Sequence, residues 1–207
     1  MKHPNSRALY DYWNDLRQSR PAPLRSELDP RAIKELLPNV FILQHDSDTA
    51  YTYRLAGTDL CHHFGCELRN ENFLSNWRKN ERQSITSLFK SIVEEHAAAV
   101  LGVKARDEAT ACNLMEYLFV PVRLDATDDI RILGCGSVFN PQPRALRSKI
   151  IRQEVSGLRI LWPENVAQFK VASSPGQAVN TRNEILPPPH KSAEKRGHLW
   201  VIEGGVT

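Results

Sequence analysis

The alternation of apolar and polar side chains is clearest over residues 51–57, and it predicts a strand around which the rest of the chain is organised. Tyr51, Tyr53 and Leu55 fall on one face of this strand, and polar or small residues fall on the other. A period of two is typical of a half-buried strand, and aromatic residues favour that setting. Gly57 ends the strand.

A short helix is expected directly after this strand. Thr58 or Asp59 can cap its start by accepting a backbone N–H, and Gly65 supplies the left-handed residue that closes it. Its apolar side carries Leu60, Cys61 and Phe64. We therefore predict that this helix covers the inner face of the strand as a lid.

Apolar residues with helical spacing also open the chain, and they predict an N-terminal helix that stops at Pro21. The stripe consists of Leu9, Tyr12, Trp13 and Leu16. It either packs on its own domain or pairs with the same stripe of a second copy. Because Tyr and Trp are enriched at interfaces, we predict a homodimer that uses these four side chains.

Two more helices are predicted. Asp29 is an N-cap residue, Pro30 fits the first helical position and Pro38 ends the segment, so a short helix is expected between them. Its buried side consists of Ile33, Leu36 and Leu37. The stripe of the longer helix consists of Ile85, Leu88, Phe89, Ile92 and His96. His96 is expected there as a last-turn cation favoured by the helix dipole or as a satisfied half-buried side chain, and not as a ligand.

Further strands are predicted at residues 40–43, 97–105, 112–123 and 130–139. Polar residues 46–49 form the hairpin turn between the first strand and the central one. The alternation within 112–123 separates two faces, and Glu116 falls among the apolar residues of one of them. Gly134 and Gly136 in the last strand mark either a bulge or a place where backbone or ligand approaches closely.

The order of these elements predicts an α+β fold. Two strands, then helices, then three strands form a five-stranded antiparallel sheet with helices on one face and the N-terminal helix flanking it. Strands and helices do not alternate as in a parallel doubly wound sheet. No Gly-rich phosphate-binding or dinucleotide-binding motif is present in the sequence.

Several short segments together resemble a known family. They are Arg54-Leu55-Ala56-Gly57-Thr58, Phe64-Gly65, Glu67-Leu68, Trp77, Tyr12-Trp13, Asp29-Pro30, Leu37-Pro38-Asn39-Val40-Phe41 and residues 198–205. Over residues 6–140 the chain is similar to a bacterial PAS-superfamily domain family of largely unknown function. The resemblance implies a sensory or interaction module with a PAS-like sheet, whose N-terminal helix often pairs with a second copy. Members often carry Arg where this chain has Cys66.

Length and charge divide the chain in two. Its 207 residues are 41% apolar and 25% charged, which suits one globular domain, placed at 1–143. Residues 144–207 hold 10 Lys and Arg against 5 Asp and Glu, a net charge of +5, whereas the whole chain carries +3. We interpret 144–207 as a basic, partly flexible extension, and we do not expect it to bind nucleic acid.

Within the extension, patterns are short. Residues 144–152 suggest a basic amphipathic helix, residues 158–162 a strand, and residues 173–197 a flexible linker rich in Pro and Ser. The apolar residues after the linker are Leu199, Val201 and Ile202. A short apolar end segment of this kind either adds to a sheet edge or docks on a partner.

One cluster has the ligand types of a metal site. Cys61, His62, His63 and Cys66 suit zinc chemically. Neighbouring residues on a helix point about 100° apart, however, and no second Cys or His pair stands at zinc-ribbon spacing, so we predict no metal. By the resemblance, His62 or His63 is an alternative axial ligand for haem, which PAS-like pockets sometimes hold. No nucleophile motif or converging pair of carboxylates is present, so we predict no enzyme, and no cofactor is named.

The predicted ligand pocket lies beneath the lid helix. Its apolar lining consists of Phe64, Phe73, Trp77, Met115, Tyr117 and Phe119. Arg54 is the polar residue in the middle of the central strand. It either lies on the outer face, paired with an acid, or points into the pocket and holds a ligand carboxylate or phosphate through its planar fork.

These expectations define a non-enzymatic sensory or regulatory module in signal transduction. It binds a small molecule or a protein partner. The alternative is an interaction adaptor whose pocket is packed with its own aromatic side chains, and a haem-binding or nucleic-acid-binding regulator is the third possibility. The sequence has no apolar run long enough to cross a bilayer and no signal peptide, so we predict a cytoplasmic protein with no membrane contact. Its four cysteines are expected to stay reduced.

Overall fold

The fold was analysed in a computed structural model. It describes residues 1–47, 49–109, 111–125, 127, 129–143, 148–162, 193–196 and 199–204, the last two segments as backbone strands. The helices are α1 (Pro4–Arg17), α2 (Thr58–Phe64) and α3 (Lys79–Glu95), with short 3₁₀ turns η1 (Arg25–Glu27), η2 (Leu37–Asn39) and η3 (Phe73–Asn76). The strands are β1 (Val40–Ser47), β2 (Ala50–Ala56), β3 (Ala98–Asp107), β4 (Cys112–Arg123), β5 (Ile130–Val138), β6 (Ile150–Leu161), β7 (Ala193–Arg196) and β8 (Leu199–Gly204).

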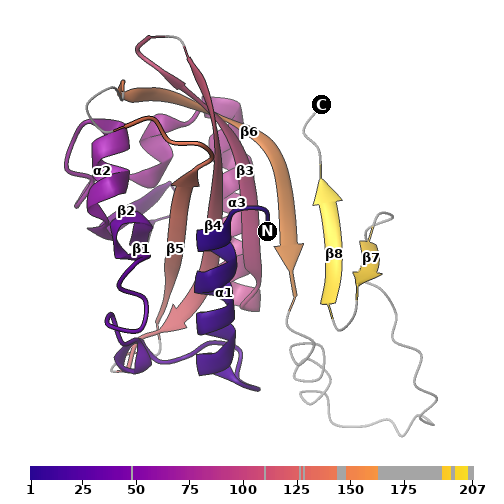
Figure 1. The fold of residues 1–207 in the computed structure, drawn as a ribbon. Coiled ribbons are helices and arrows are strands. Elements are labelled where there is room, and N and C mark those ends of the chain that lie inside the picture. The colour runs from indigo at the N-terminus through magenta and orange to yellow at the C-terminus, as the bar shows by residue number, and fades with distance from the viewer. Residues whose placement is uncertain are drawn as a thin grey trace, which may run out of the picture.

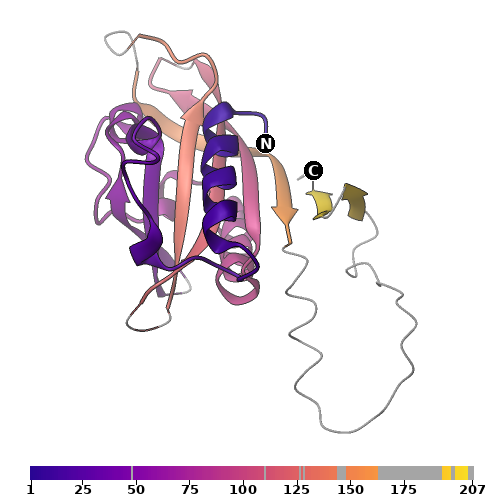
Figure 2. The same cartoon turned by 60° about the horizontal axis from the view of Figure 1, so that its bottom comes forward.

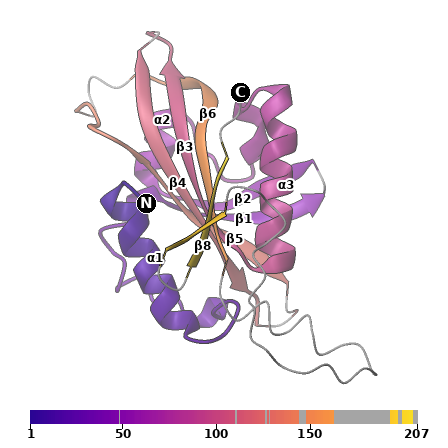
Figure 3. The ribbon, with the colours of Figure 1, turned by 90° about the vertical axis from the view of Figure 1, so that its right-hand side faces the viewer.

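All described strands belong to one antiparallel sheet in the order β2-β1-β5-β4-β3-β6-β8-β7 (Figure 1). The five predicted strands form its first part, and α2 and α3 lie on one face, as predicted. We call this the inner face. α1 crosses the opposite, outer face over β4 and β5 (Figures 2 and 3). The protein is therefore an α+β sheet covered on both faces, with the N-terminal helix as the outer cover.

β4 supplies side chains to both cores. Tyr117 and Phe119 are buried on the inner face, in one cluster with residues of β1, β2, α2 and α3. Leu118 and Val120 are buried on the outer face with Leu9 and Trp13 of α1 and with residues of β1 and β5. This confirms the two faces that the alternation of residues 112–123 predicts.

The central strand carries a bulge that its sequence pattern did not reveal. Ile42 pairs with Leu55 and Leu43 pairs with Tyr53, so Arg54 is an extra residue on β2. Such a bulge reverses the faces that follow it. Leu55 is consequently 41% exposed instead of sharing the buried face of Tyr53, and this corrects the prediction for Leu55.

The short helix predicted after Asp29 is wrong as an α-helix. Residues 30–36 form a series of turns that leads into η2. Asp29 does accept a 2.9 Å hydrogen bond from the backbone N–H of Arg31. Ile33 and Leu36 are buried as predicted, whereas Leu37 is 37% exposed, which corrects the prediction for that residue. A segment this short, enclosed between Pro30 and Pro38, has too few backbone hydrogen bonds to offset the cost of starting a helix.

His96 follows α3 in the left-handed conformation, with φ 57°. Burial lowers the pKa of its imidazole, and the positive charge of Arg123 lowers it further. The charged form is thus disfavoured, and of the two predicted alternatives the structure agrees with the half-buried side chain rather than with the last-turn cation.

β6 extends the sheet beyond the five predicted strands. It pairs with β3 from Asp107–Ile150 to Ala98–Leu161. The predicted basic helix is therefore wrong over 150–152, because pairing with the open edge of β3 overrides local helix preference; residues 144–147 lie outside the described residues. The boundary at residue 143 stays a prediction, although the described part of the extension continues the domain's own sheet.

The end of the chain adds to this edge. β8 pairs with β6 through four residue pairs, from Leu158–Gly204 to Leu161–Val201. This confirms that the apolar end segment adds to a sheet edge, one of the two predicted alternatives. Residues 193–196 form β7, and the rest of the predicted linker, 173–192 and 197, lies outside the described residues. Among the described residues no helix is long and apolar enough to cross a membrane.

Candidate functional site

The side chains of the predicted pocket do converge beneath α2. Each is at most 2% exposed and belongs to the inner core: Phe64, Phe73, Trp77, Met115, Tyr117 and Phe119. They come from α2, from the η3 turn and its following residue, and from β4. The prediction that these elements bring them together is confirmed, whereas their role in binding a ligand stays a proposal.

Aromatic rings fill the space that these residues surround. Phe73 lies at the centre, and six ring centroids stand 5.4–6.0 Å from its own: Phe41, Tyr53, Trp77, Phe89, Tyr117 and Phe119. These are the ordinary distances of packed aromatic pairs. The inner core is thus occupied by the protein's own side chains.

Close packing also explains two glycines of β5. A Cβ on Gly134 would collide with the ring of Phe41 and would lie 2.8 Å from the carbonyl oxygen of Leu118. A Cβ on Gly136 would lie 2.5 Å from Cε1 of Tyr117. Of the two alternatives predicted for these glycines, the structure shows a close approach, and the approaching groups are the protein's own rings.

Buried polar groups in this core need hydrogen-bond partners. The Tyr117 hydroxyl donates a 2.7 Å hydrogen bond to Oε1 of Gln153, and burial raises the pKa of Tyr117 far above its usual value. The indole N–H of Trp77 is an exception, because it is buried and has no acceptor among the described residues. A buried donor without a partner costs about 1–3 kcal/mol.

Arg54 lies outside the inner core. As the extra residue of the β2 bulge it is exposed to solvent. Its charge contributes to a lowered pKa of Arg131, whose first cause is burial, so the two guanidinium groups share one surface region. The alternative in which Arg54 points into the pocket as an anion clamp is corrected by this exposure.

The four residues of the apolar stripe on α1 differ in their burial. Leu9 and Trp13 are buried against the outer face of their own sheet, and the Trp13 indole donates a 2.7 Å hydrogen bond to the carbonyl oxygen of Pro121. Tyr12 and Leu16 are partly exposed. Leu9 and Trp13 therefore serve their own domain, which corrects the expectation that all four face a second copy.

The cysteine and histidine cluster on α2 does not hold the geometry of a metal site. Among the described residues no group of three or more His, Cys, Asp or Glu lies close enough to hold an ion. His63 is 5% exposed, and its Nε2 stands 3.6 Å from Oδ2 of Asp59. Haem does not fit either, because His63 faces Asp59 and the aromatic rings fill the space beneath α2.

Asp59 belongs to a polar chain that links α2 to α1. Its Oδ2 accepts a 3.3 Å hydrogen bond from Asn39 of η2, whose Oδ1 accepts one of 3.3 Å from Nδ2 of Asn5. The same Nδ2 stands 3.1 Å from the hydroxyl of Ser137 on β5. The lid over the inner core and the helix over the outer face are thus connected by direct contacts.

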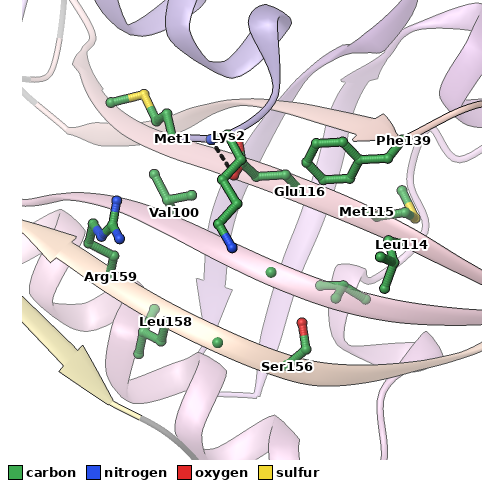
Figure 4. A pocket seen from close by; sticks show the side chains of 13 residues that line it. Met1, Lys2, Val100, Leu114, Met115, Glu116, Phe139, Ser156, Leu158 and Arg159 are labelled. Carbon is green, nitrogen blue, oxygen red and sulfur yellow. Dashed lines mark hydrogen bonds between the residues drawn. The ribbon is translucent and has the colours of Figure 1, made fainter.

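A hollow of about 520 Å³ lies on the outer face, beside the start of α1 (Figure 4). Its lining comes from the first two residues and from β3, β4, β6 and the residue after β5: Met1, Lys2, Val100, Gly102, Val103, Leu114, Met115, Glu116, Phe139, Ser156, Gly157, Leu158 and Arg159. Apolar side chains predominate, and Lys2, Glu116 and Arg159 supply charge.

Two glycines make the hollow. Gly102 of β3 pairs directly with Gly157 of β6, and a Cβ on Gly157 would meet no atom within 4 Å. Sequence reasoning missed this site, since it placed no strand before residue 158 in the extension. The only signal was a glycine within each apolar segment, and such a signal does not show that the two glycines face each other.

Glu116 anchors the chain start at this hollow. Its carboxylate is 4% exposed and accepts hydrogen bonds of 2.8 Å and 2.9 Å from the backbone N–H groups of Lys2 and His3. A buried carboxylate needs such donors. This explains why an acidic residue occupies an otherwise apolar face of β4.

A single sheet with strand order 2-1-5-4-3 and helices packed on its inner face defines a PAS-type module. Residues 1–137 match the family described as PAS domain, so the chain belongs to the PAS domain family. PAS domains are in general sensory and signalling modules, and this protein is a module of that kind.

Solved PAS structures resemble it distantly. The PAS-B domain of Cycle from Drosophila melanogaster, with bound ethylene glycol, is 14% identical with a TM-score of 0.38, over 48% of this chain and 99% of that one. The PAS domain of an HTR-like protein from Haloarcula marismortui is 13% identical with a TM-score of 0.37, over 53% of this chain and 90% of that one. No curated protein matches the chain.

Proposed function

We propose that this protein is a PAS signalling module that works by binding a protein partner on its outer face, with an inner core kept closed by its own side chains. The observation that carries this proposal is the aromatic cluster around Phe73, which occupies the space between sheet and α2. A cluster packed at these distances stabilises the fold by itself and needs no guest. Signalling then depends on contacts at the surface.

The hollow beside α1 is the proposed contact site. Its volume of about 520 Å³ lies within the range of roughly 300–1,000 Å³ that binding pockets show. Val100, Leu114 and Phe139 offer apolar walls, and the cations Lys2 and Arg159 favour an acidic group at the rim. The partner would insert an apolar side chain that stands next to a carboxylate.

Native mass spectrometry of freshly purified protein tests the closed core. We expect the mass of the protein chain with no small molecule retained. A small molecule bound at one copy per chain would contradict the proposal. The same spectrum reports the subunit count, and therefore tests a homodimer through the exposed parts of Tyr12 and Leu16.

Filling the hollow tests the contact site. Gly157→Leu adds a side chain where there is open space, so partner capture from cells of the source organism should be lost while the melting temperature stays the same. Ala111→Leu, at an exposed turn between β3 and β4, is the matched control and should keep the partner. If Gly157→Leu and Ala111→Leu captured the partner equally well, the partner would not bind in the hollow.

A second candidate function is the predicted sensor with a ligand beneath α2. The observation that favours it is the buried indole N–H of Trp77, which lacks an acceptor among the described residues. A ligand oxygen could accept this hydrogen bond if Phe64, Phe73, Met115, Tyr117 and Phe119 yielded space. Trp77→Phe removes the donor, so a ligand seen in the wild-type spectrum should then be lost without unfolding. Under either candidate we propose a bacterial, cytoplasmic protein.

A further inference from the structure

The C-terminal turn of α2 places two cysteines side by side. Gly65 has φ 64°, and its N–H donates a 3.2 Å hydrogen bond to the carbonyl oxygen of His62. The N–H of Cys66 donates one of 3.2 Å to the carbonyl oxygen of Cys61. This pair of bonds is the Schellman motif, in which the two residues joined by the longer bond frequently bring their side chains into contact. In this protein those two residues are Cys61 and Cys66.

The backbone bond sets a limit on the distance between the two residues. Standard bond lengths and the 3.2 Å hydrogen bond sum to about 7.4 Å along the path between the Cα atoms of Cys61 and Cys66. The bent path through the carbonyl oxygen makes the true distance shorter than this sum. Disulfides join Cα atoms about 4.4–6.8 Å apart. The limit that the turn sets on this distance therefore overlaps the range that a disulfide spans.

Electrostatics place both thiols in one locality. A charge on Cys66 raises the pKa of Cys61, although burial is the larger cause. Both cysteines also contribute to the raised pKa of Tyr53, whose first cause is burial. Two groups that act on each other and on the same phenol lie close together, in agreement with the backbone geometry.

The two thiols differ in access. Cys66 is exposed, whereas Cys61 is partly buried against the inner core and its Sγ lies 3.4 Å from Oε1 of Glu67. In the reduced protein both are free. The exposed thiol is thus the one that an oxidant in solution reaches first, and the half-buried thiol is placed to respond.

We propose that Cys61 and Cys66 are an oxidation site that closes into an intramolecular disulfide when the protein meets a peroxide. The Cys66 sulfur takes one oxygen from hydrogen peroxide, becomes a sulfenic acid and releases one water. The Cys61 sulfur then attacks the Cys66 sulfur, the S–S bond forms and a second water leaves. Two thiols lose two electrons and two protons, and one peroxide becomes two waters.

The disulfide would fix the end of the lid. Leu60 and Phe64 of α2 are at most 2% exposed and cover the aromatic cluster. A bond between Cys61 and Cys66 closes the last turn of this helix and takes the Cys61 sulfur away from Glu67. Oxidation of an exposed thiol thereby changes the helix that covers the inner core. This redox response is separate from the proposed surface contact, and it does not require that contact to exist.

Intact-mass measurement of the full chain tests this site. After hydrogen peroxide treatment we expect a loss of about 2 Da, which dithiothreitol restores, and a Cys61–Cys66 link in the peptide map. Cys61→Ser or Cys66→Ser should abolish the loss. Cys112→Ser is the matched control, because Cys112 is also exposed, and it should leave the loss unchanged.

Hydrogen exchange provides a second measurement. Amides of residues 58–66 should exchange more slowly after oxidation of the wild type, and at the original rate in Cys66→Ser. A gain of about 16 Da without the 2 Da loss, a link that involves Cys112 or Cys135, or a dimer joined through Cys66 would each overturn the proposal.

Discussion

The hydroxyl of Tyr117 on β4 donates a 2.7 Å hydrogen bond to Oε1 of Gln153 on β6, across the intervening strand β3. Both side chains are at most 1% exposed. Gln153 lies beyond residue 137, where the match to the PAS domain family ends. The added strand is therefore built into the inner core and is not a loose attachment to the sheet edge.

Removing this hydroxyl should destabilise the protein. Tyr117→Phe leaves the Gln153 oxygen buried without its donor, so we expect the free energy of unfolding to fall by about 1–3 kcal/mol in urea titrations. Tyr12→Phe, at an exposed hydroxyl, is the control and should cost less. In the double variant with Gln153→Leu, part of the loss should return; costs that simply add would mean that the two groups do not interact.

Two glycines of one sheet should respond oppositely to the same change. Gly134→Ala drives a methyl group into Phe41 and the backbone of Leu118, and should lower the free energy of unfolding by about 1–3 kcal/mol or more. Gly157→Ala points into open space and should change it by no more than about 0.5 kcal/mol. Thermal unfolding of the two variants makes the comparison. Equal effects would show that the rings beneath α2 are not packed against β5.

Trp13 should matter for folding and not for assembly. Its ring is 1% exposed and its N–H bonds to Pro121, so Trp13→Ala is expected to cost about 3–5 kcal/mol of unfolding free energy. Tyr12→Ala, one position away and partly exposed, should cost far less. Sedimentation velocity at low temperature distinguishes the alternative: a Trp13→Glu variant that dissociates from dimer to folded monomer would restore the interface prediction.

His3 should make α1 sensitive to acid. Its Nδ1 caps the helix by accepting a 3.1 Å hydrogen bond from the N–H of Asn5, and burial lowers the pKa of His3, although the negative charge of Glu116 opposes this. The folded state thus binds a proton less readily than the unfolded state. Stability from this group is present above about pH 6.5 and is lost as pH falls from there through the lowered folded pKa.

His3→Asn keeps a capping oxygen that does not titrate. The drop in melting temperature between pH 8 and pH 5 should be smaller in His3→Asn than in the wild type. His96, whose pKa is also lowered by burial and then by Arg123, remains in both proteins, so the difference between them reports His3 alone. An identical drop in both proteins would assign the acid sensitivity elsewhere.

Sequence patterns predicted what depends on long, regular alternation. β4 alternates over twelve residues, and its two faces and the place of its aromatic side chains in the inner core follow from that alternation. The Arg54 bulge was not visible, because a one-residue shift in hydrogen-bond register leaves the composition of a strand unchanged. Residues 150–157 of β6 were missed for another reason, although residues 158–161 were predicted as a strand: their conformation depends on the free edge of β3, which no local pattern encodes.

The candidate sites also differ in whether a regular sequence pattern predicts them. Aromatic residues at regular spacing are visible in a sequence, so the side chains of the inner core could be predicted. The hollow exists because Gly102 and Gly157 lack side chains and meet across two strands far apart in sequence. A hollow that arises from missing side chains leaves no pattern of apolar or polar residues in the sequence, so it could not be predicted. Cys61 and Cys66 lie between these cases: their spacing and the closing residue Gly65 were visible in the sequence, but the backbone hydrogen bond that joins the two cysteines was not.

Glu116 serves two structures at once. Its oxygens hold the backbone of Lys2 and His3, where α1 begins, and the same side chain lines the hollow. A bound group that donated hydrogen bonds to this carboxylate in place of Lys2 and His3 would weaken the docking of α1. A bound group that left both of these hydrogen bonds intact would stabilise the docking of α1. Occupancy of the hollow and attachment of the first helical turn are thus thermodynamically linked, and each must change the equilibrium constant of the other by the same factor.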